Sequence, residues 1–537
     1  MKKYLLLALC TAAQVCYAQN VIKRGPYLNT ATQTGIKVLF RTAEPCLAKV
    51  NVTLENGEIT PFTASETSDS NQVVLIDGLQ PGKTYPYQCL CNDVALTDNS
   101  DSSFYFRTLP SDDYAGPINI WAIGDFGEGS PEQKQVKNAY QAYMKANNWN
   151  TDVWLMLGDN AYGDGTDEEY QTKNFEIYPD LYRNTTAWPA PGNHDYKSVN
   201  IITHNGPYYD IYDLPKEGQS GGLASGTEFY YSFDVGNTHF VCLNSEWTPY
   251  IYAPIASPMA LWLIADMQQS KKTWKVAFWH QPPYTKGSHD SDDPFSIMAT
   301  FRQNILPFLE LGGCDIALQG HSHCYERSFL LSGHYGYSQL FNEKRHVVDG
   351  SSGKLSEGTP YYKAKSGLNA NKGTVYNVVG NSGKVSESGT IDHPVMYYSD
   401  NVTLGSAAIR IHGDTLTSRY ISNVGDVLDE YTIIKTEDGK PGNTVDIIEK
   451  ENNDNIQLRL LNLYGKVWLS FELYTPEVCE LKIINSEGKT VAIILPKSHI
   501  NVGKRMYEIP SDLENGNYIG VLETSHGRLS NVFNYSK

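Results

Sequence analysis

Residues 314–323 read Cys-Asp-Ile-Ala-Leu-Gln-Gly-His-Ser-His, and this stretch decides how the rest of the chain is interpreted. A mostly apolar run, Cys314–Leu318, is followed by Gly320 and then by two histidines one residue apart. Imidazole is the commonest metal ligand in proteins, and a loop at a strand end can aim side chains into a crevice. The stretch therefore predicts a short buried strand whose exit loop carries metal ligands.

Four upstream segments resemble this arrangement. In the strand-led ones, a short apolar run leads directly into a polar residue of a type that binds metals, and runs this apolar are expected of strands buried on both faces. The segments are Ile118–Ile123 before Gly124 and Asp125, Val153–Leu157 before Gly-Asp-Asn-Ala-Tyr at 158–162, Pro191–Asp195, and Lys275–Trp279 before His280. Because sites in layered α/β folds form beyond the carboxyl ends of the strands, we expect these loops to converge.

The converging loops supply seven side chains of ligand type. This set is too large for one tetrahedral ion and suits two metals that share a bridging group. The predicted metal ligands are Asp125, Asp159, Tyr162, Asn193, His280, His321 and His323.

In order along the chain, the blocks GDFG, GDNAY, GNHD, the histidine of WHQPPY and GHSH resemble the five blocks of the calcineurin-like metallophosphoesterases. Tyr162, which ends GDNAY, narrows the resemblance to the purple acid phosphatases. Flanking stretches agree with it: RGPYL at 24–28, YYSFDVGNTHFVCLNSE at 230–246 and GHSHCYERS at 320–328. The resemblance covers roughly residues 22 to 435. Ala277 and Asp195 depart from common family residues, and neither position is a ligand in the family.

The resemblance also implies roles for the ligand set. Asp125, Tyr162 and His323 would hold Fe(III), with Asp159 bridging to a second, divalent ion (Fe, Zn or Mn). Hard carboxylate and phenolate oxygens suit Fe(III), while amide oxygen and imidazole suit a borderline divalent ion. The ligands of the second ion would be Asn193, His280 and His321.

Two further histidines are predicted to be catalytic. His194 follows the ligand Asn193 and would donate to the phosphoryl oxygens or protonate the leaving group. His289 lies nine residues after His280 and matches the family's substrate histidine loop. The other histidines have no comparable context and are interpreted as structural: His204, His239, His334, His346, His393, His412, His499 and His526.

This set implies a secreted dinuclear-metal acid phosphatase that hydrolyses phosphomonoesters by attack of a metal-activated hydroxide. A trivalent ion generates hydroxide below neutral pH, which makes an acid optimum the expectation. One alternative is a phosphodiesterase or nucleotide pyrophosphatase on the same metal core. Another is an inactive surface-binding protein, although such a protein would have no need of the full ligand set. Substrate choice is expected to depend on rim loops at 201–228 and 329–372.

The composition restricts the partners. The chain has 43 Lys and Arg against 60 Asp and Glu, a net charge of −17, and no run of five basic residues. A long polyanion is therefore an unfavourable partner, and a small phosphate ester captured by metals and histidines is expected rather than nucleic acid. Nothing in the sequence bears on oligomeric state.

The N-terminus and the cysteines indicate the compartment. Residues 1–18 combine two lysines, a short apolar core and a final Cys-Tyr-Ala, which predicts a cleaved signal peptide and a secreted, periplasmic or cell-surface protein. No later stretch is long and apolar enough for a membrane span. Among the remaining seven cysteines, Cys46 could pair with Cys89 or Cys91, and Cys314 and Cys324 are interpreted as buried thiols.

A length of 537 residues favours three domains after the signal peptide. Residues 19–110 alternate apolar and polar positions between turn signals, which predicts a β-sandwich of fibronectin type III kind. Residues 111–436 are expected to form the α/β metallophosphoesterase sandwich, with two mixed sheets flanked by helices. Residues 437–537 are expected to form a β-sandwich-like accessory or sorting domain. Within the catalytic region, Ser130 and Gln133 predict a helix start with a capping box, and residues 329–372 are interpreted as long loops.

Overall fold

The computed structural model describes residues 21–64, 71–246, 257–367, 369–386, 389–440, 458–463, 466–473, 476–485, 489–524 and 527–535. The predicted signal peptide at 1–18 lies outside this part of the chain.

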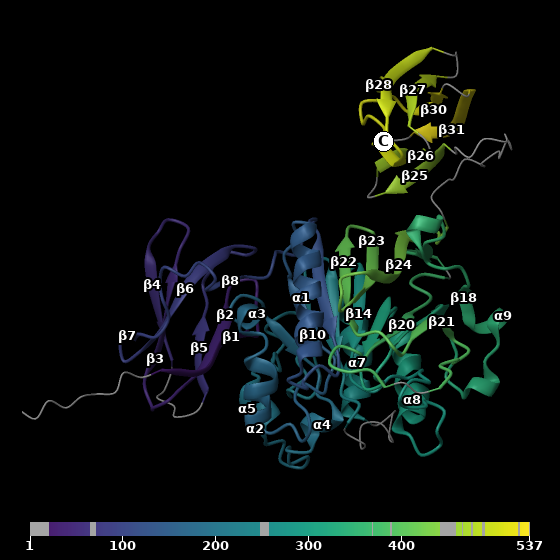
Figure 1. Ribbon diagram of the computed structural model, residues 1–537. Helices are drawn as coiled ribbons and strands as arrows, with labels where there is room; N and C mark the ends of the chain where they lie inside the picture. Colours follow the sequence, from purple (N-terminus) through teal and green to yellow (C-terminus); the bar gives the residue numbers. More distant parts are fainter. Residues whose placement is uncertain are drawn as a thin grey trace, which may run out of the picture.

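Two seven-stranded sheets form the centre of the molecule (Figure 1). The first has the order β11-β10-β9-β22-β23-β24-β19, and the second has the order β12-β13-β14-β15-β20-β16-β21. The first sheet consists of β9 Ile118–Ile123, β10 Val153–Met156, β11 Ala187–Pro189, β19 Tyr361–Ala364, β22 Gly405–His412, β23 Thr415–Ser422 and β24 Val427–Thr436. The second consists of β12 Tyr231–Val235, β13 Thr238–Cys242, β14 Trp274–Phe278, β15 Ile316–Gln319, β16 Tyr325–Ser328, β20 Val375–Val379 and β21 Met396–Asp400.

The strand register explains why the ligand loops meet. Strands β9, β10 and β11 run parallel, as do β13, β14, β15 and β20. Every residue of β9, β10 and β15 is buried, as the apolar runs predicted. Parallel neighbours end at the same edge of a sheet, so the loops that follow these strands emerge side by side.

Helices cover the outer faces of both sheets. Helix α1 (Pro131–Ala146) packs on the first sheet, where Tyr140 stacks on Trp121 at 4.4 Å between ring centroids. Helices α7 (Pro258–Gln269) and α8 (Ile297–Leu311) share one buried cluster with the outer face of the second sheet. The shorter helices are α2 Asp167–Tyr170, η1 Gln171–Phe175, α3 Pro179–Tyr182, α4 Asn193–Tyr196, α5 Pro207–Ile211, η2 Ser338–Leu340, α9 Glu343–His346 and η3 Leu355–Glu357.

The start of α1 differs in one detail from the predicted capping box. The Ser130 hydroxyl accepts a hydrogen bond from the Gln133 backbone N–H at 3.1 Å, as expected of an N-cap. The Gln133 side chain, however, accepts from the N–H of Gly129 at 2.7 Å rather than from that of Ser130. The Gln133 side chain therefore binds the backbone N–H of the residue before the N-cap.

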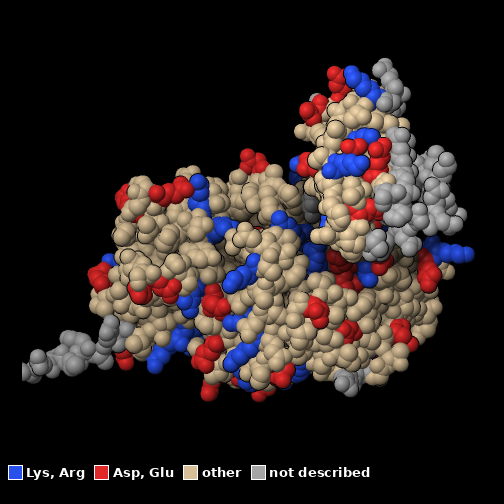
Figure 2. All heavy atoms as spheres, turned by 45° about the horizontal axis from the view of Figure 1, so that its top comes forward, with Lys and Arg blue, Asp and Glu red and all other residues tan. Residues whose placement is uncertain are grey.

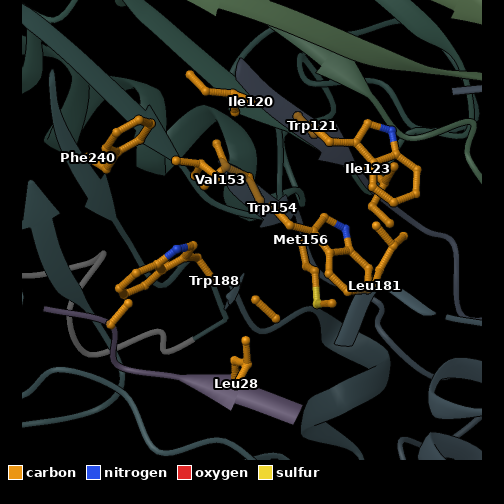
Figure 3. Close-up of a cluster of buried hydrophobic side chains, with 14 of the residues drawn as sticks. Leu28, Ile120, Trp121, Ile123, Val153, Trp154, Met156, Leu181, Trp188 and Phe240 are labelled. Carbon is orange, nitrogen blue, oxygen red and sulfur yellow. The ribbon is translucent and has the colours of Figure 1, made fainter. Parts of the chain in front are cut away.

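Aromatic side chains dominate the core beside the first sheet. Figure 3 shows Trp121, Trp154 and Trp188, which come from β9, β10 and β11. Trp121 and Trp154 stack at 5.6 Å, and Trp188 stacks on Phe233 of the second sheet at 3.7 Å. The contact between Trp188 and Phe233 joins the two sheets across their apolar inner faces. Trp121 and Trp154 lie on the other face of the first sheet, where Tyr140 of α1 stacks on Trp121.

The N-terminal region is built of short antiparallel strands, as predicted. One sheet has the order β1-β2-β5, and the other contains β4-β3-β6-β7 with β8 paired to β6. The strands are β1 Ile22–Asn29, β2 Ile36–Thr42, β3 Ala48–Thr53, β4 Ile59–Thr63, β5 Asn71–Ile76, β6 Thr84–Cys91, β7 Val94–Ala95 and β8 Tyr105–Arg107. Of the two pairings left open for Cys46, the structure has the disulfide to Cys91, and Cys89 is a buried thiol.

The stretch RGPYL attaches this region to helices α2 and α5 of the central region. Arg24 is 2% exposed and donates to Asp167 at 2.8 Å, and the Tyr27 hydroxyl donates to the Ile211 carbonyl at 2.9 Å. Arg41 of the neighbouring strand also pairs with Asp167, at 2.6 Å. One carboxylate on α2 thus receives two guanidinium groups from the N-terminal region.

The C-terminal region is also β-rich. Its strands form one sheet of order β25-β26-β29 and another of order β28-β27-β30-β31 over a separate apolar core. The strands are β25 Arg459–Leu463, β26 Lys466–Leu473, β27 Glu477–Asn485, β28 Thr490–Ile500, β29 Gly503–Glu508, β30 Gly516–Thr524 and β31 Gly527–Tyr535. Two mixed sheets flanked by helices, with β-rich regions before and after them, confirm the predicted fold class.

The interpretation of 329–372 as long loops is wrong in part. The segment contains β17 (Leu330–Leu331), which pairs with β18 (Val347–Asp349), as well as α9 and β19. The strands are too short for sequence periodicity to reveal them, and β19 gains its ladder from β24, where Tyr361 pairs with Ile433, 72 residues later.

The surface gives no sign of a broad basic region on the face drawn in Figure 2, where acidic and basic side chains are interspersed. Within the described part of the chain, no helix is long and apolar enough to cross a membrane.

Candidate metal centre

Three of the predicted ligands have unusual backbone conformations. Asp125, Asp159 and His321 have φ values of 54°, 53° and 65°, and each follows a glycine at a strand end. Few residues other than glycine adopt this left-handed region, and they do so where the surrounding structure enforces it. The tight turn redirects each side chain from the end of its strand into the space between the loops.

Glycine at one of these turns also makes room for a ligand. A Cβ atom on Gly158, whose φ is +92°, would lie 2.4 Å from Nδ1 of His280. Any side chain here would displace the imidazole from its position.

Asp125, Tyr162 and His323 form one half of the cluster. The Tyr162 hydroxyl lies 2.9 Å from Oδ1 of Asp125 and 3.1 Å from Nε2 of His323. The second oxygen of Asp125 accepts from the His321 backbone N–H at 2.6 Å, which fixes the carboxylate. Asp125 is fully buried and Tyr162 is 4% exposed.

Asn193, His280 and His321 form the other half. Oδ1 of Asn193 lies 2.9 Å from Nδ1 of His321 and 3.1 Å from Nε2 of His280. The two ring nitrogens are 3.3 Å apart. An amide oxygen and two imidazole nitrogens therefore face a common point.

Asp159 lies between the halves. Its Oδ1 is 3.4 Å from Nε2 of His280 and accepts from the His194 backbone N–H at 2.9 Å. Its carboxylate also contacts the Tyr162 hydroxyl. Asp125, Asp159 and His280 each offer a ligand atom, and these three atoms lie within 4.8 Å of one another.

The donor set fits metal ions. Nδ1 of His280 is bonded to the Leu157 carbonyl at 2.8 Å, and Nδ1 of His323 is bonded to the Ser386 hydroxyl at 3.0 Å. In both rings this leaves Nε2 facing the cluster, and such outer bonds are what orient metal-bound histidines. The first half offers hard oxygen ligands and the second offers amide oxygen and imidazole, so the two halves suit ions of different hardness.

The electrostatics of the cluster follow from burial and mutual charge. Burial alone would lower the pKa of His280, but the Asp159 and Asp125 carboxylates raise it well above its ordinary value. The pKa of His321 lies well below its ordinary value because the ring is buried and His280 is adjacent. Burial, together with Asp125 and Asp159, raises the pKa of Tyr162 well above 10.

Both predicted catalytic histidines lie at the cluster. Nε2 of His194 is 3.9 Å from Oδ2 of Asp159, while its Nδ1 lies 2.5 Å from the Gly163 carbonyl. The His289 ring stacks on His321 with centroids 4.0 Å apart. The structure therefore brings all nine predicted site residues together, and their roles remain a prediction.

Sequence reasoning missed the loop Gly380–Ser386. Ser386 holds Nδ1 of His323, and the ammonium of Lys384 lies 4.0 Å from the centre of the Tyr162 ring. This loop follows β20 through Gly380, which is the same sequence of strand, glycine and polar residues that identified the other loops. The strand-and-glycine pattern could have identified this loop. It did not, because the loop carries Ser and Lys rather than residues that commonly bind metals.

Asp195 is not a predicted ligand, but it binds two of the turns that carry ligands. It is fully buried and accepts hydrogen bonds from the Gly192 N–H at 2.8 Å and the Asn160 N–H at 3.1 Å. The Tyr170 hydroxyl donates to it at 2.5 Å. One carboxylate thus joins the turn that carries Asn193 to the turn that carries Asp159.

Comparisons with known proteins identify the central region. Residues 118–325 match the family model described as calcineurin-like phosphoesterase. Purple acid phosphatase 22 of Arabidopsis thaliana is 26% identical over 291 residues, which are 52% of this chain and 58% of that protein. Purple acid phosphatase 21 of the same plant is 29% identical over 278 residues, or 50% of this chain and 56% of that protein. The chain spans about half the length of the curated relatives it matches.

A solved structure shows the same fold. Purple acid phosphatase PPD1 from yellow lupin (Lupinus luteus) seeds superposes with a TM-score of 0.59 at 15% identity, covering 79% of this chain and 78% of that one.

Proposed function

We propose, because residues 118–325 form a calcineurin-like phosphoesterase domain whose homologues are purple acid phosphatases, that the chain is a metal-dependent phosphomonoesterase. The proposal includes a dinuclear centre of Fe(III) and a divalent ion. The observation that carries it is the convergence of seven ligand side chains in two halves around Asp159. A cluster of this kind has the charge and geometry to hold two cations, and a binding surface has no use for it.

Each ligand has a proposed place. Asp125, Tyr162 and His323 would hold the ferric ion, Asn193, His280 and His321 would hold the divalent ion, and Asp159 would bridge them. Bound together, the two cations would reduce the charge on the phosphate ester and activate water as the nucleophile.

His194 and His289 would act on the substrate. The contact between Nδ1 of His194 and the Gly163 carbonyl leaves Nε2 on the side of the ring that faces Asp159. A ring held in this way can donate from Nε2 to a phosphoryl oxygen or to the leaving oxygen. His289, which is exposed and stacks on His321, can donate to another phosphoryl oxygen.

We further propose that residues 1–18 are a signal peptide, that 19–110 form a fibronectin type III-like domain and that 437–537 form an accessory or sorting domain. Mass spectrometry of the mature protein from its native host would identify the first residue. A mature chain that retains residues 1–18 would contradict export by cleavage.

Elemental analysis combined with a substrate panel tests the central proposal. The expected result is about two metal equivalents per chain, one of them iron. p-Nitrophenyl phosphate should be hydrolysed much faster than bis-p-nitrophenyl phosphate or a nucleotide pyrophosphate. Faster hydrolysis of the diester or the pyrophosphate would replace the proposed substrate class, and a protein that loads one equivalent would contradict the dinuclear centre.

A further inference from the structure

A buried carboxylate lies behind the histidine loop without a role in the proposed chemistry. Glu326 is on β16, three residues after His323, and it is fully buried. Burial raises its pKa, while hydrogen bonds from Thr285 and Lys286 act in the opposite direction. A buried carboxylate is costly unless hydrogen bonds satisfy it, so its partners indicate what it does.

The partners of Glu326 belong mainly to another loop. The Thr285 hydroxyl donates to Oε2, and the Lys286 backbone N–H donates to Oε1 at 3.1 Å. The Cys324 thiol also donates to Oε2, at 3.4 Å. Both oxygens of the carboxylate therefore bind the segment 284–289, which carries His289.

The same segment is seated on the histidine loop at two more points. The Ser288 hydroxyl accepts from the His323 backbone N–H at 2.9 Å. At Gly287 the backbone passes so close to the side chains of the histidine loop that a Cβ atom would lie 2.3 Å from Oγ of Ser322. Because His289 belongs to this segment, a shift of the segment would also shift the His289 ring, which stacks on His321.

We propose that Glu326 is a positioning residue that holds segment 284–289, and with it the His289 ring, at the substrate side of the metal centre. The proposal rests on the proposed function of His289 as a substrate ligand. Among the described residues, no hydrogen bond or ion pair joins the Glu326 carboxylate to a predicted metal ligand, so we expect its effect on catalysis to pass through the segment it holds, which carries His289.

A double-mutant cycle between Glu326 and His289 tests this. We would measure KM and kcat for p-nitrophenyl phosphate, and the inhibition constant of inorganic phosphate, for Glu326→Ala, His289→Ala and the double variant. Each single variant should raise KM and the inhibition constant, by about 10-fold for loss of one charge-assisted hydrogen bond. In the His289→Ala background, Glu326→Ala should add less than about 2-fold, because residues that act through one another are not additive.

Two control variants separate positioning from stability. Glu326→Gln keeps an oxygen for the Lys286 N–H and an amide for Thr285, and it should restore KM to near the wild-type value. Glu310 on α8 accepts from the Tyr376 hydroxyl, the Tyr335 hydroxyl and the Gly333 N–H, at 2.8, 2.9 and 2.8 Å. None of these hydrogen bonds comes from segment 284–289, so Glu310→Ala should lower the melting temperature and leave KM unchanged.

Metal content and melting temperature are recorded for every variant. If Glu326→Ala fails to fold, Thr285→Val removes the same contact from the loop side and should give the same rise in KM. Additive losses in the double variant, or an unchanged KM in Glu326→Ala, would overturn the positioning role alone. An unchanged KM in His289→Ala would overturn the substrate role of His289 and this inference with it.

Discussion

Strand β15 has charged groups at both ends, and the two ends are compensated in different ways. At its start, Asp315 is fully buried and pairs with Lys363 at 2.6 Å and Lys435 at 2.8 Å. Beyond its other end, the carboxylates of Asp125 and Asp159 face histidines, a tyrosine and backbone N–H groups. Within the described residues, no lysine or arginine forms an ion pair with either.

This difference in charge compensation distinguishes Asp315, a structural carboxylate, from Asp125 and Asp159, which are predicted metal ligands. A buried carboxylate with its own cations needs nothing further, and its role is to hold elements together. Carboxylates that face histidines, a phenol and an amide, with no lysine or arginine of their own in the described part of the chain, are instead suited to a cation that binds from outside. Burial alone would not have distinguished the two ends, because both are almost completely inaccessible to solvent.

An aspartate-to-asparagine substitution should lower catalytic activity at one end of β15 and the free energy of unfolding at the other. The largest effect is expected at the metal centre. Asp159→Asn removes the proposed bridging carboxylate and should reduce kcat/KM by about four orders of magnitude, since each metal supplies several kcal/mol of charge stabilisation. The free energy of unfolding of the metal-free protein should change little. Steady-state kinetics, elemental analysis and urea unfolding measure these quantities, and retained activity with two bound metals would contradict the bridging role.

Asp315→Asn should give the opposite pattern. Two buried ammonium groups would lose their counter-charge, which costs about 3 to 5 kcal/mol of folding free energy. The metal content and kcat/KM of the folded fraction should stay near wild type, because Asp315 lies at the far end of the strand. Urea unfolding checks the first expectation and kinetics below the melting temperature check the second. A variant that folds normally but loses metal would show that the two ends are not independent.

The two ends also differ in how well the sequence predicts them. The ligand loops can be predicted from local sequence. Most of them follow a short apolar strand, and most begin with a glycine and a residue of ligand type. The fold class followed from the same pattern. By contrast, Asp315 is 48 residues from Lys363 and 120 from Lys435, and no spacing rule connects them.

Contacts of this range, including those of Ser386 with His323 and of Glu326 with segment 284–289, arise only when the strands are paired. The short strands at 330–349 escaped detection for a related reason, since their stability comes from pairing rather than from their own residues.

His239 is a buried histidine that is held by two carboxylates and has no free ring nitrogen for a metal. Nδ1 binds Asp234 at 2.7 Å and Nε2 binds Asp266 at 2.8 Å, so both ring nitrogens donate and neither remains for a metal. Burial alone would lower the pKa of His239, but its hydrogen bonds to Asp234 and Asp266 raise it to about 9. A raised pKa means that the stabilisation is fully present below pH 6.5 and is lost as the pH rises through about 9.

The expected stabilisation from this pair of contacts is on the order of 3 kcal/mol. Unfolding free energies of wild type and His239→Gln, measured at pH 6 and above pH 9, should therefore converge at the higher pH. A difference that stays constant across this range would show that the ring is neutral in the folded protein.

The smallest effect is expected at Tyr162, a predicted ligand whose loss leaves the neighbouring carboxylate held by another bond. Tyr162→Phe removes the hydroxyl that lies 2.9 Å from Asp125, yet the carboxylate keeps its bond from the His321 N–H. Phenylalanine fills the same space, so both metals should remain bound and kcat/KM should fall by less than about 10-fold, the cost of one hydrogen bond.

A phenolate bound to Fe(III) gives a charge-transfer band in the visible spectrum, and this band should disappear while most of the activity survives. Visible spectroscopy of protein with a measured iron content checks this. Colour that persists in Tyr162→Phe, or a colourless wild type with a full ferric complement, would remove Tyr162 from the ligand set. The site would then be a two-metal centre of other composition, and the phenolate would no longer distinguish one half of the cluster from the other.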